Sequence, residues 1–264
     1  MRLKRFIEWL KNLMFPSGYC CIVCDRELQD AGQYWMCDRC IKELPRNNGK
    51  LCIRCGEQIL NTSAIVCLNC KSSAPAFTQA FAPLLYKPPV SNLIRGLKYD
   101  NKRYLAEALG GFILTSYIEN NLSCDFVVPV PLHLDRQRER GYNQSELLCG
   151  KLAEVIKLPI RTDIMERTKN TLSQADLEKQ DRIKNVEEAF KVVNKKACKN
   201  AIILLVDDVY TTGSTLNACA KSLFKAGANK VYCITPAHTI SAEEMARLRK
   251  EEDKNKQQKN VGLF

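Results

Sequence analysis

Two carboxylates followed by a short hydroxylated segment form the most informative chemical feature of the sequence. Asp207 and Asp208 follow the apolar run 203–206 and precede Thr211–Thr215, which reads Thr-Thr-Gly-Ser-Thr and is called the hydroxylated loop below. A loop of this kind at a helix N-terminus presents backbone N–H groups to an anion, and the helix dipole favours negative charge there. Carboxylates only accept hydrogen bonds, so they suit sugar hydroxyls or a Mg²⁺ shell. The order of these groups predicts a site for a sugar phosphate such as ribose 5-phosphate.

A simpler interpretation treats the two acids as a polar strand end and Thr212 or Ser214 as the N-cap of the next helix. That interpretation would be sufficient for a single residue. The complete order of strand, acids, hydroxyls and Gly213 favours the ligand site, because a glycine lets the backbone approach a phosphate closely.

Four Cys-x-x-Cys pairs form a second chemical feature. Their spacing is regular, because 12, 11 and 11 residues separate successive pairs. Two pairs complete a closed tetrahedral Cys₄ shell around Zn²⁺, so we predict two structural zinc sites. Sequential and interleaved pairing both fit the spacing, and four pairs in series disfavour a redox dithiol. The predicted ligands are Cys21, Cys24, Cys37, Cys40, Cys52, Cys55, Cys67 and Cys70.

Hydrophobic periodicity predicts the elements that must position these groups. Short apolar runs that indicate buried strands alternate with helical patterns, which is typical of a parallel sheet. Ligands bind at the carboxyl ends of such strands. We expect strands at 126–130, 202–206 and 231–235, and helices at about 103–119, 145–157 and 214–226.

Composition changes along the chain predict four parts. No stretch has the length of a membrane span, and charged residues interrupt any signal-peptide core near the start. We therefore expect a cytoplasmic protein whose clustered cysteines bind metal rather than form disulfides. The expected parts are an amphipathic helix at 1–17, a double zinc-ribbon module at 18–72, an α/β domain at 77–240 and a charged tail at 241–264.

The formal net charge of +11 raises the question of nucleic-acid binding. Four thiolates around one Zn²⁺ leave a charge of about −2. Residues 1–75 hold 11 Lys/Arg and 7 Asp/Glu, so two zinc sites would bring that part to about zero. Residues 76–264 hold 29 Lys/Arg and 22 Asp/Glu, which places any basic surface on the larger domain.

The segment 203–215 resembles the phosphoribosyl-diphosphate-binding signature of type I phosphoribosyltransferases. Tyr210 departs from that signature, which usually has an aliphatic residue at this position. The wider chain resembles the ComF family over nearly all of residues 18–238. Besides the paired cysteines, the resemblance covers Gly96–Tyr99, Val128–Leu132, Arg140–Gln144 and Gln174 onward to Arg182.

The resemblance implies a type I phosphoribosyltransferase-like parallel sheet flanked by helices and preceded by a small Cys₄ zinc-ribbon module. It implies that Asp207 and Asp208 contact the ribose hydroxyls as the catalytic pair. The residues implied to surround the 5-phosphate are Thr211, Thr212, Gly213, Ser214 and Thr215. Pro129, Val130 and Pro131 would lie at the diphosphate, with Arg136 and Arg140 on a mobile loop that closes over it. A solvated charged loop is the alternative for these arginines.

The resemblance also implies a function. The chain would bind phosphoribosyl diphosphate with Mg²⁺ and act as a phosphoribosyltransferase in competence, natural transformation and DNA uptake, together with other competence proteins. The alternative is a non-catalytic accessory protein that binds single-stranded DNA through its zinc ribbons and a basic surface. A thiol redox sensor ranks third. His133 follows the predicted diphosphate segment and is either a ligand contact or a plain surface residue, and His238 follows the predicted strand 231–235 and could face the ligand crevice.

Overall fold

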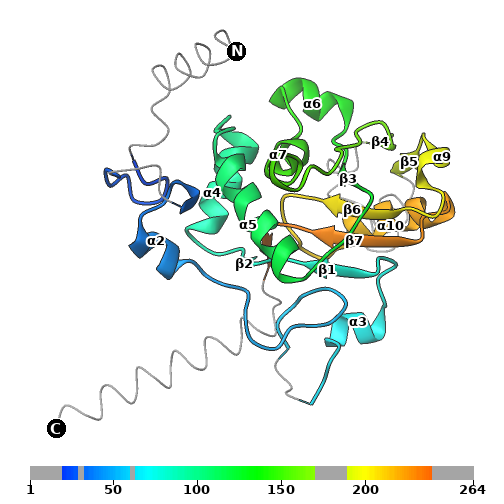
Figure 1. Cartoon of the computed structure of the whole chain (residues 1–264), viewed down its shortest axis with the longest axis horizontal. Helices are drawn as coiled ribbons and strands as arrows, with labels where there is room; N and C mark the ends of the chain where they lie inside the picture. The colour runs from blue at the N-terminus through cyan, green and yellow to red at the C-terminus, as the bar shows by residue number, and fades with distance from the viewer. Residues whose placement is uncertain (1–19, 29–32, 60–62, 170–188, 240–264) are drawn as a thin grey trace, which may run out of the picture.

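The computed structural model describes residues 20–28, 33–59, 63–169 and 189–239. The predicted amphipathic helix and the charged tail lie outside these ranges, as do Gln174 and Arg182. Within the described residues, a central sheet of four parallel strands has the order β1-β7-β6-β3 (Figure 1). The strands are β1 Gln79–Phe81, β3 Phe126–Pro129, β6 Ile202–Val206 and β7 Lys230–Ile234.

Strand β6 lies in the middle of the sheet and determines its two faces. Its sequence is entirely apolar, as expected of a parallel strand that is buried on both sides. Leu204 pairs with Val127 of β3 and with Tyr232 of β7. The predicted parallel sheet flanked by helices is confirmed, and its three predicted strands agree with the structure to within one residue at each end.

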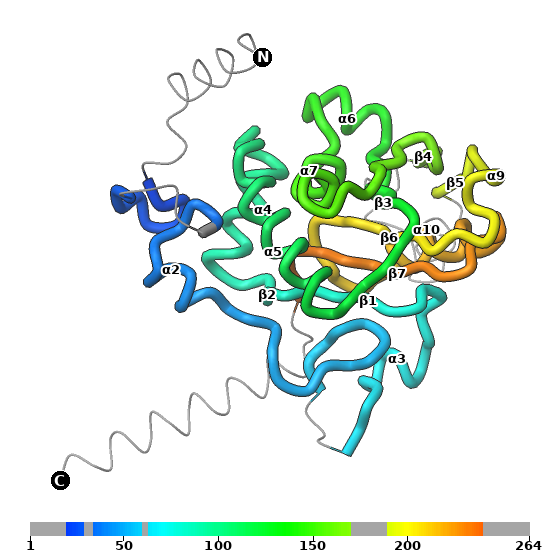
Figure 2. Tube along the Cα trace, viewed as in Figure 1, coloured from blue at the N-terminus to red at the C-terminus, as the bar shows by residue number. Residues whose placement is uncertain are grey.

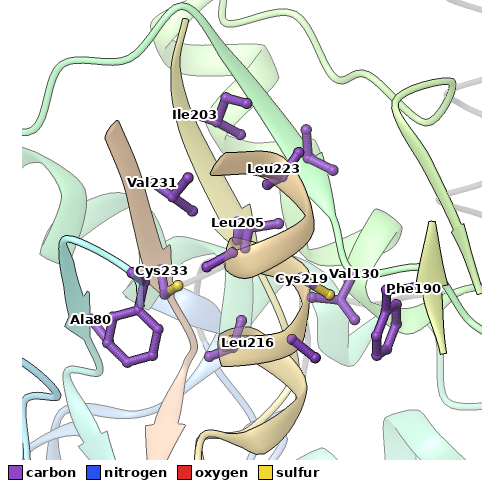
Figure 3. Close-up of a cluster of buried hydrophobic side chains, with 14 of the residues drawn as sticks. Ala80, Val130, Phe190, Ile203, Leu205, Leu216, Cys219, Leu223, Val231 and Cys233 are labelled. Carbon is purple, nitrogen blue, oxygen red and sulfur yellow. The ribbon is translucent and has the colours of Figure 1, made fainter. Parts of the chain in front are cut away.

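The principal helices are α4 Val90–Tyr99, α5 Leu105–Glu119, α7 Gln144–Ile156 and α10 Ser214–Lys225. Helices α4, α5 and α7 share one hydrophobic core with one face of the sheet. Helix α10 packs on the other face, where Leu216, Cys219 and Leu223 face Leu205 and Val231 (Figure 3).

Shorter elements complete the described part of the chain. They are the 3₁₀ turn η1 Gln33–Trp35, α2 Asp38–Glu43, α3 Leu68–Ser72, β2 Leu84–Leu85, α6 Leu134–Arg140, α9 Lys195–Cys198 and β8 Ala237–His238. Strands β4 Met165–Arg167 and β5 Phe190–Val192 form an antiparallel pair beside α10. None of the helices in the described residues combines the length and the apolar character that a bilayer span needs.

The predicted zinc ligands form two clusters of four cysteines, one on each face of the sheet. The first cysteine cluster (Cys21, Cys24, Cys37 and Cys40) packs with α4 and α5, and the second cysteine cluster (Cys52, Cys55, Cys67 and Cys70) packs with α10. The trace in Figure 2 shows the two segments diverging, with the first beside α4 and the second beneath β1. Each half of the cysteine segment therefore shares a core with the α/β domain, and the boundary predicted between 18–72 and 77–240 stays a prediction.

An aromatic contact attaches the first cysteine cluster to α5. The ring of Tyr34 stacks on Phe112 with 4.1 Å between ring centroids, and its hydroxyl lies 2.6 Å from the Thr115 hydroxyl. Gly111 makes room for this ring, because a Cβ there would lie 2.5 Å from a ring carbon of Tyr34. The close approach depends on the missing side chain.

Two helical glycines provide a matched test of this contact. We expect Gly150→Ala, at a site with no heavy atom within 4 Å, to raise the free energy of unfolding by about 0.5–1 kcal/mol through helix propensity. Gly111→Ala should instead lower it by about 1–2 kcal/mol, because the new methyl group displaces Tyr34. Urea unfolding of both variants measures the difference. An equal gain for both would show that Tyr34 does not occupy this position.

Candidate functional site

The acidic pair lies at the carboxyl end of β6, and Asp208 is the more enclosed of the two acids. Its side chain is buried, and both of its oxygens have partners. The Lys98 ammonium lies 2.7 Å from Oδ1, and the Gln144 amide donates to Oδ2 at 2.7 Å. The ion pair and the second donor satisfy both oxygens of this buried carboxylate.

Asp207 has a different environment. Its Oδ1 accepts hydrogen bonds from the Ser145 hydroxyl at 3.1 Å and from the backbone N–H of Asp208 at 2.9 Å. Burial, followed by the negative charge of Asp208, raises the pKa of Asp207 to about 7, although Lys98 and the hydrogen bonds oppose the increase. Asp207 is therefore the acid whose charge an incoming cation or hydroxyl donor would stabilise.

Lys98 connects helix α4 to this pair. Burial lowers the pKa of its ammonium, but attraction to Asp208 outweighs burial, and the net change is upward. The neighbouring Tyr99 ring lies under the Arg140 guanidinium at 5.6 Å, and Arg140 donates to the Gln144 side chain. A continuous set of polar contacts therefore runs from the acidic pair to the basic end of α6.

Lys98 and Gln144 both lie within motifs of the family resemblance, Gly96–Tyr99 and Arg140–Gln144, but no contact with the acidic pair was predicted for them or for Ser145. Ser145 is the next residue after the second motif, in the first turn of α7. Asn143 caps this helix, because its side chain accepts from the Ser145 N–H at 3.0 Å. The cap directs the first turn of α7 toward the end of β6.

The hydroxylated loop leads directly into α10. Thr211, Thr212 and Ser214 are exposed, and the Thr212 and Ser214 hydroxyls lie 2.7 Å apart. Gly213 has φ of 73°, a left-handed conformation that favours glycine. The first intrahelical hydrogen bond of α10 runs from the Asn217 N–H to the Gly213 carbonyl, so the preceding amides face the open end of the helix. The loop offers hydroxyl and N–H donors to an anion.

The three residues predicted to bind diphosphate, Pro129, Val130 and Pro131, differ in burial and in their hydrogen bonds. Val130 is buried, its N–H donates to the Val206 carbonyl at 2.9 Å, and its carbonyl accepts from Asn143 at 3.1 Å. Val130 therefore has no free hydrogen-bonding group for a ligand. Pro129 ends β3, and Pro131 follows in the partly exposed turn.

The basic stretch expected as a loop forms helix α6 instead. His133 caps it by accepting from the Asp135 N–H at 3.3 Å, and Gly141 ends it in a left-handed conformation. The alternation of charges resembled a solvated loop, but the two end residues supply both helix caps. Arg136 and Arg140 are both partly buried on this helix.

Arg167 is a cation that the sequence analysis did not identify. It lies at the end of β4 and packs over the Phe190 ring at 5.3 Å. Burial, and next the positive charge of Arg136, lower the pKa of its guanidinium, while Asp207 opposes the change. The charges of Arg136 and Asp207 therefore both act on Arg167, and guanidinium groups are well suited to bind an anion. No spacing rule links these residues, because β4 reaches the site only through tertiary packing.

Tyr210 and His238 lie beneath the hydroxylated loop. Their rings stack with centroids 4.3 Å apart, and both side chains are buried. Burial lowers the pKa of His238, and its Nδ1 contacts the Thr239 carbonyl. His238 is therefore neutral and packed against Tyr210, rather than a surface residue.

Both cysteine clusters fit a tetrahedral metal ion. The four sulfurs of each cluster lie within 4.8 Å of one another. Zn–S bonds of about 2.3 Å place the sulfurs of a tetrahedron about 3.8 Å apart. The Sγ atoms of Cys24 and Cys37 are 3.8 Å apart, and those of Cys55 and Cys67 are 3.6 Å apart. The pairing is sequential, which resolves the alternative that the spacing left open.

The remaining cysteines lie outside these clusters. The sequence predicts Cys124, Cys149, Cys198, Cys219 and Cys233 as core thiols, and the last four are buried among apolar side chains, whereas Cys124 is only partly buried. Cys20 is exposed.

The chain is similar to curated proteins that are named for competence and DNA utilization. It is 32% identical to competence protein F of Haemophilus influenzae over 80% of this chain and 93% of that protein. It is 30% identical to DNA utilization protein YhgH of Escherichia coli K12, over 77% and 91%. It is 26% identical to competence protein ComFC of Bacillus subtilis, over 73% and 79%. No protein-family model matches the chain.

Two solved structures also match 48% of this chain. One is described as the allosteric regulatory enzyme of purine biosynthesis, with 19% identity and a TM-score of 0.33. The other is glutamine phosphoribosylpyrophosphate amidotransferase from B. subtilis, with 20% identity and a TM-score of 0.34. The matched part spans 24% and 25% of those two chains.

The raised pKa of Asp207 predicts a pH-dependent stability difference. The folded protein holds this proton more tightly than the unfolded chain, so the stability contributed by Asp207 is present below about pH 4 and is lost as pH rises toward about 7. We expect Asp207→Asn, which stays neutral, to gain stability relative to wild type across this interval and no further above it. Urea unfolding between about pH 5 and 8 measures the difference.

Asp163→Asn is the matched control for this experiment. Hydrogen bonds from Arg161 lower the pKa of the exposed Asp163 carboxyl, so its stabilising effect is lost only at lower pH. Its difference from wild type should remain constant over the same interval. A constant difference for Asp207→Asn as well would contradict the raised pKa.

Proposed function

Because the chain belongs to the ComF family, we propose that its α/β domain binds phosphoribosyl diphosphate with Mg²⁺ and acts as a phosphoribosyltransferase in DNA uptake and natural transformation. The names of its relatives, competence protein F and DNA utilization protein, support the biological process. The type I phosphoribosyltransferase-like fold supports the ligand.

The observation that carries the proposal is the acidic pair one loop before the open end of α10. Asp207 and Asp208 supply acceptors for a ribose diol, and the hydroxylated loop supplies donors for a 5-phosphate. Both groups follow β6, so the strand and helix fix their separation. Ribose 5-phosphate carries the complementary groups in the same order.

The cations around the pair support a diphosphate beside the ribose. The positive charge of Arg136 acts on Arg167, and Arg140 reaches the acidic pair through Gln144. Guanidinium groups bind diphosphate oxygens in bidentate geometry. The negative charge of a diphosphate would complement these arginines.

The proposed reaction breaks the bond between the anomeric carbon and diphosphate, while an acceptor nucleophile forms the new bond at that carbon. Asp207 and the hydroxylated loop hold the sugar in place, and the arginines stabilise the charge that develops on the departing diphosphate. Bound Mg²⁺ supplies further neutralisation of that charge. Lys98 orients Asp208 through their ion pair.

We further propose that each cysteine cluster holds one structural Zn²⁺. A closed Cys₄ shell has no open position, so these ions would support the fold rather than the reaction. Cysteines arranged as metal ligands suit a reducing compartment, which favours a cytoplasmic location.

Calorimetric titration tests the ligand proposal. We expect wild type to bind phosphoribosyl diphosphate saturably with Mg²⁺, and Asp207→Asn/Asp208→Asn to lose at least about tenfold in affinity, since hydrogen bonds to charged groups contribute about 1.5–3 kcal/mol each. Asp163→Asn, far along the chain and paired with Arg161, should bind as wild type does. Absence of binding by folded, zinc-loaded wild type would contradict the proposal.

A second candidate function rests on two exposed aromatic side chains. Tyr99 is 70% exposed and Tyr104 is 51% exposed, although both carry large rings. Basic residues surround them, and Arg140 lies over the Tyr99 ring. The exposed ones nearest in sequence are Arg95, Lys102 and Arg103. Exposed rings among cations are typical of surfaces that bind single-stranded nucleic acid by stacking. This surface adjoins the proposed ligand site, so both functions can operate in one protein.

Single-stranded DNA binding would depend on these rings. We expect Tyr99→Ala/Tyr104→Ala to weaken binding of a labelled oligothymidylate by about tenfold or more, because one stacked base contributes about 1–3 kcal/mol. Tyr99→Phe/Tyr104→Phe keeps the rings and should bind as wild type does. Fluorescence anisotropy at several salt concentrations measures both affinity and phosphate contacts. Equal affinity of the alanine variant, or no dependence on salt, would contradict this function.

A further inference from the structure

Tyr210, the residue that departs from the phosphoribosyl-diphosphate-binding signature, lies between the hydroxylated loop and the second cysteine cluster. Its side chain is 7% exposed and belongs to the hydrophobic core that contains all four cysteines of that cluster. The ring therefore shares one buried core with the proposed metal ligands.

The other end of the contact is Gly213 in the hydroxylated loop. A Cβ at Gly213 would lie 2.3 Å from the Tyr210 hydroxyl oxygen, so the loop backbone rests directly on this tyrosine. The backbone N–H of Tyr210 donates to the Ala237 carbonyl at 2.9 Å, and its ring stacks on His238. These contacts hold Tyr210 in place, and its ring in turn determines the position of the loop backbone at Gly213.

A second connection joins the same two regions. The chain leaves the second cysteine cluster through α3, and the Ala76 N–H then donates to the Asn217 side chain at 2.7 Å. Asn217 lies in the first turn of α10, where its own N–H donates to Gly213. The next residue, Phe77, is buried and meets the Tyr210 ring edge-on at 6.3 Å. Two independent contacts therefore link the cluster to the start of α10.

The first cysteine cluster belongs to a different core from Tyr210 and α10. It packs on the opposite face of the sheet with α4 and α5, where Tyr34 and Phe112 stack. Cys40 and Cys70 are each 6% exposed and each is the last ligand of its cluster. The two clusters thus offer a comparison of the same chemistry at two positions.

We propose that the second cysteine cluster, when it holds its metal ion, positions the hydroxylated loop through Tyr210 and Asn217, so that Tyr210 is a positioning residue of the phosphate site. The loop would lose its fixed position when the cluster loses its metal ion, although the cysteines are not part of the proposed phosphate site. The consequence for ligand binding rests on the proposed function, whereas the consequence for loop order does not.

Hydrogen exchange on two cysteine variants tests the proposal. We expect Cys70→Ser to lose one zinc ion by native mass spectrometry and to raise amide exchange at Thr211–Leu216 by about tenfold or more, because a local contact has been released. Cys40→Ser should also lose one zinc ion, but should raise exchange near Tyr34 and leave the hydroxylated loop unchanged. Equal exchange at the loop in both variants, or no change in Cys70→Ser, would overturn the proposal.

Substitutions of Tyr210 provide a second test of the proposal, which applies even if a cysteine variant fails to fold. We expect Tyr210→Leu to retain two zinc ions, to raise exchange at Thr211–Leu216, and to weaken ribose 5-phosphate binding by about three- to tenfold, which corresponds to the loss of aromatic contacts. Tyr210→Phe keeps the ring and should change each quantity less. Unchanged exchange in Tyr210→Leu would overturn the positioning role. If wild type binds no ribose 5-phosphate, the proposed function fails, and exchange alone decides this inference.

Discussion

Burial of two adjacent carboxylates at the end of the central strand constrains the arrangement of the elements around it. Two like charges in a poorly solvated position are costly unless donors and a cation reach them. Lys98 comes from α4, and Gln144 and Ser145 come from the capped start of α7. Both helices pack on the same face of the sheet, so the packing of that face and the ionisation of the pair depend on each other.

The sheet also separates two cysteine clusters that lie next to each other in the sequence. Consecutive Cys-x-x-Cys pairs form each cluster, yet β6 lies between the clusters, with Leu204 facing one core and Leu205 facing the other. The chain passes from one face of the sheet to the other between the two clusters, so each cluster packs with the helices of its own face. Only the second cluster shares its core with Tyr210 and α10, so the clusters differ in what they can influence.

Local sequence patterns were sufficient where local physics determines the structure. The apolar run of β6 and the regular cysteine spacing predicted a central strand and two Cys₄ groups, because periodicity and tight turns are properties of short segments. The residues that complete the site come from elsewhere. Arg167 reaches it through the β4–β5 pair, and helix α6 was mistaken for a loop because its caps, rather than its charges, determine its structure. Contacts between segments that are far apart in the sequence produce no regular residue spacing, so sequence patterns do not predict them.

The charged groups of this site have opposite signs and come from separate elements. Asp207 and Asp208 follow β6, whereas Arg136 lies on α6 and Arg167 at the end of β4, and the charges of Arg136 and Asp207 both act on Arg167. A purely anionic ligand would offset only the charge of the arginines, and a metal ion alone would offset only the charge of the acids. The proposed ligand, a diphosphate that carries both a metal ion and a sugar diol, would complement both groups at once. A ligand that must complement both groups together is restricted more narrowly than one that meets either group alone.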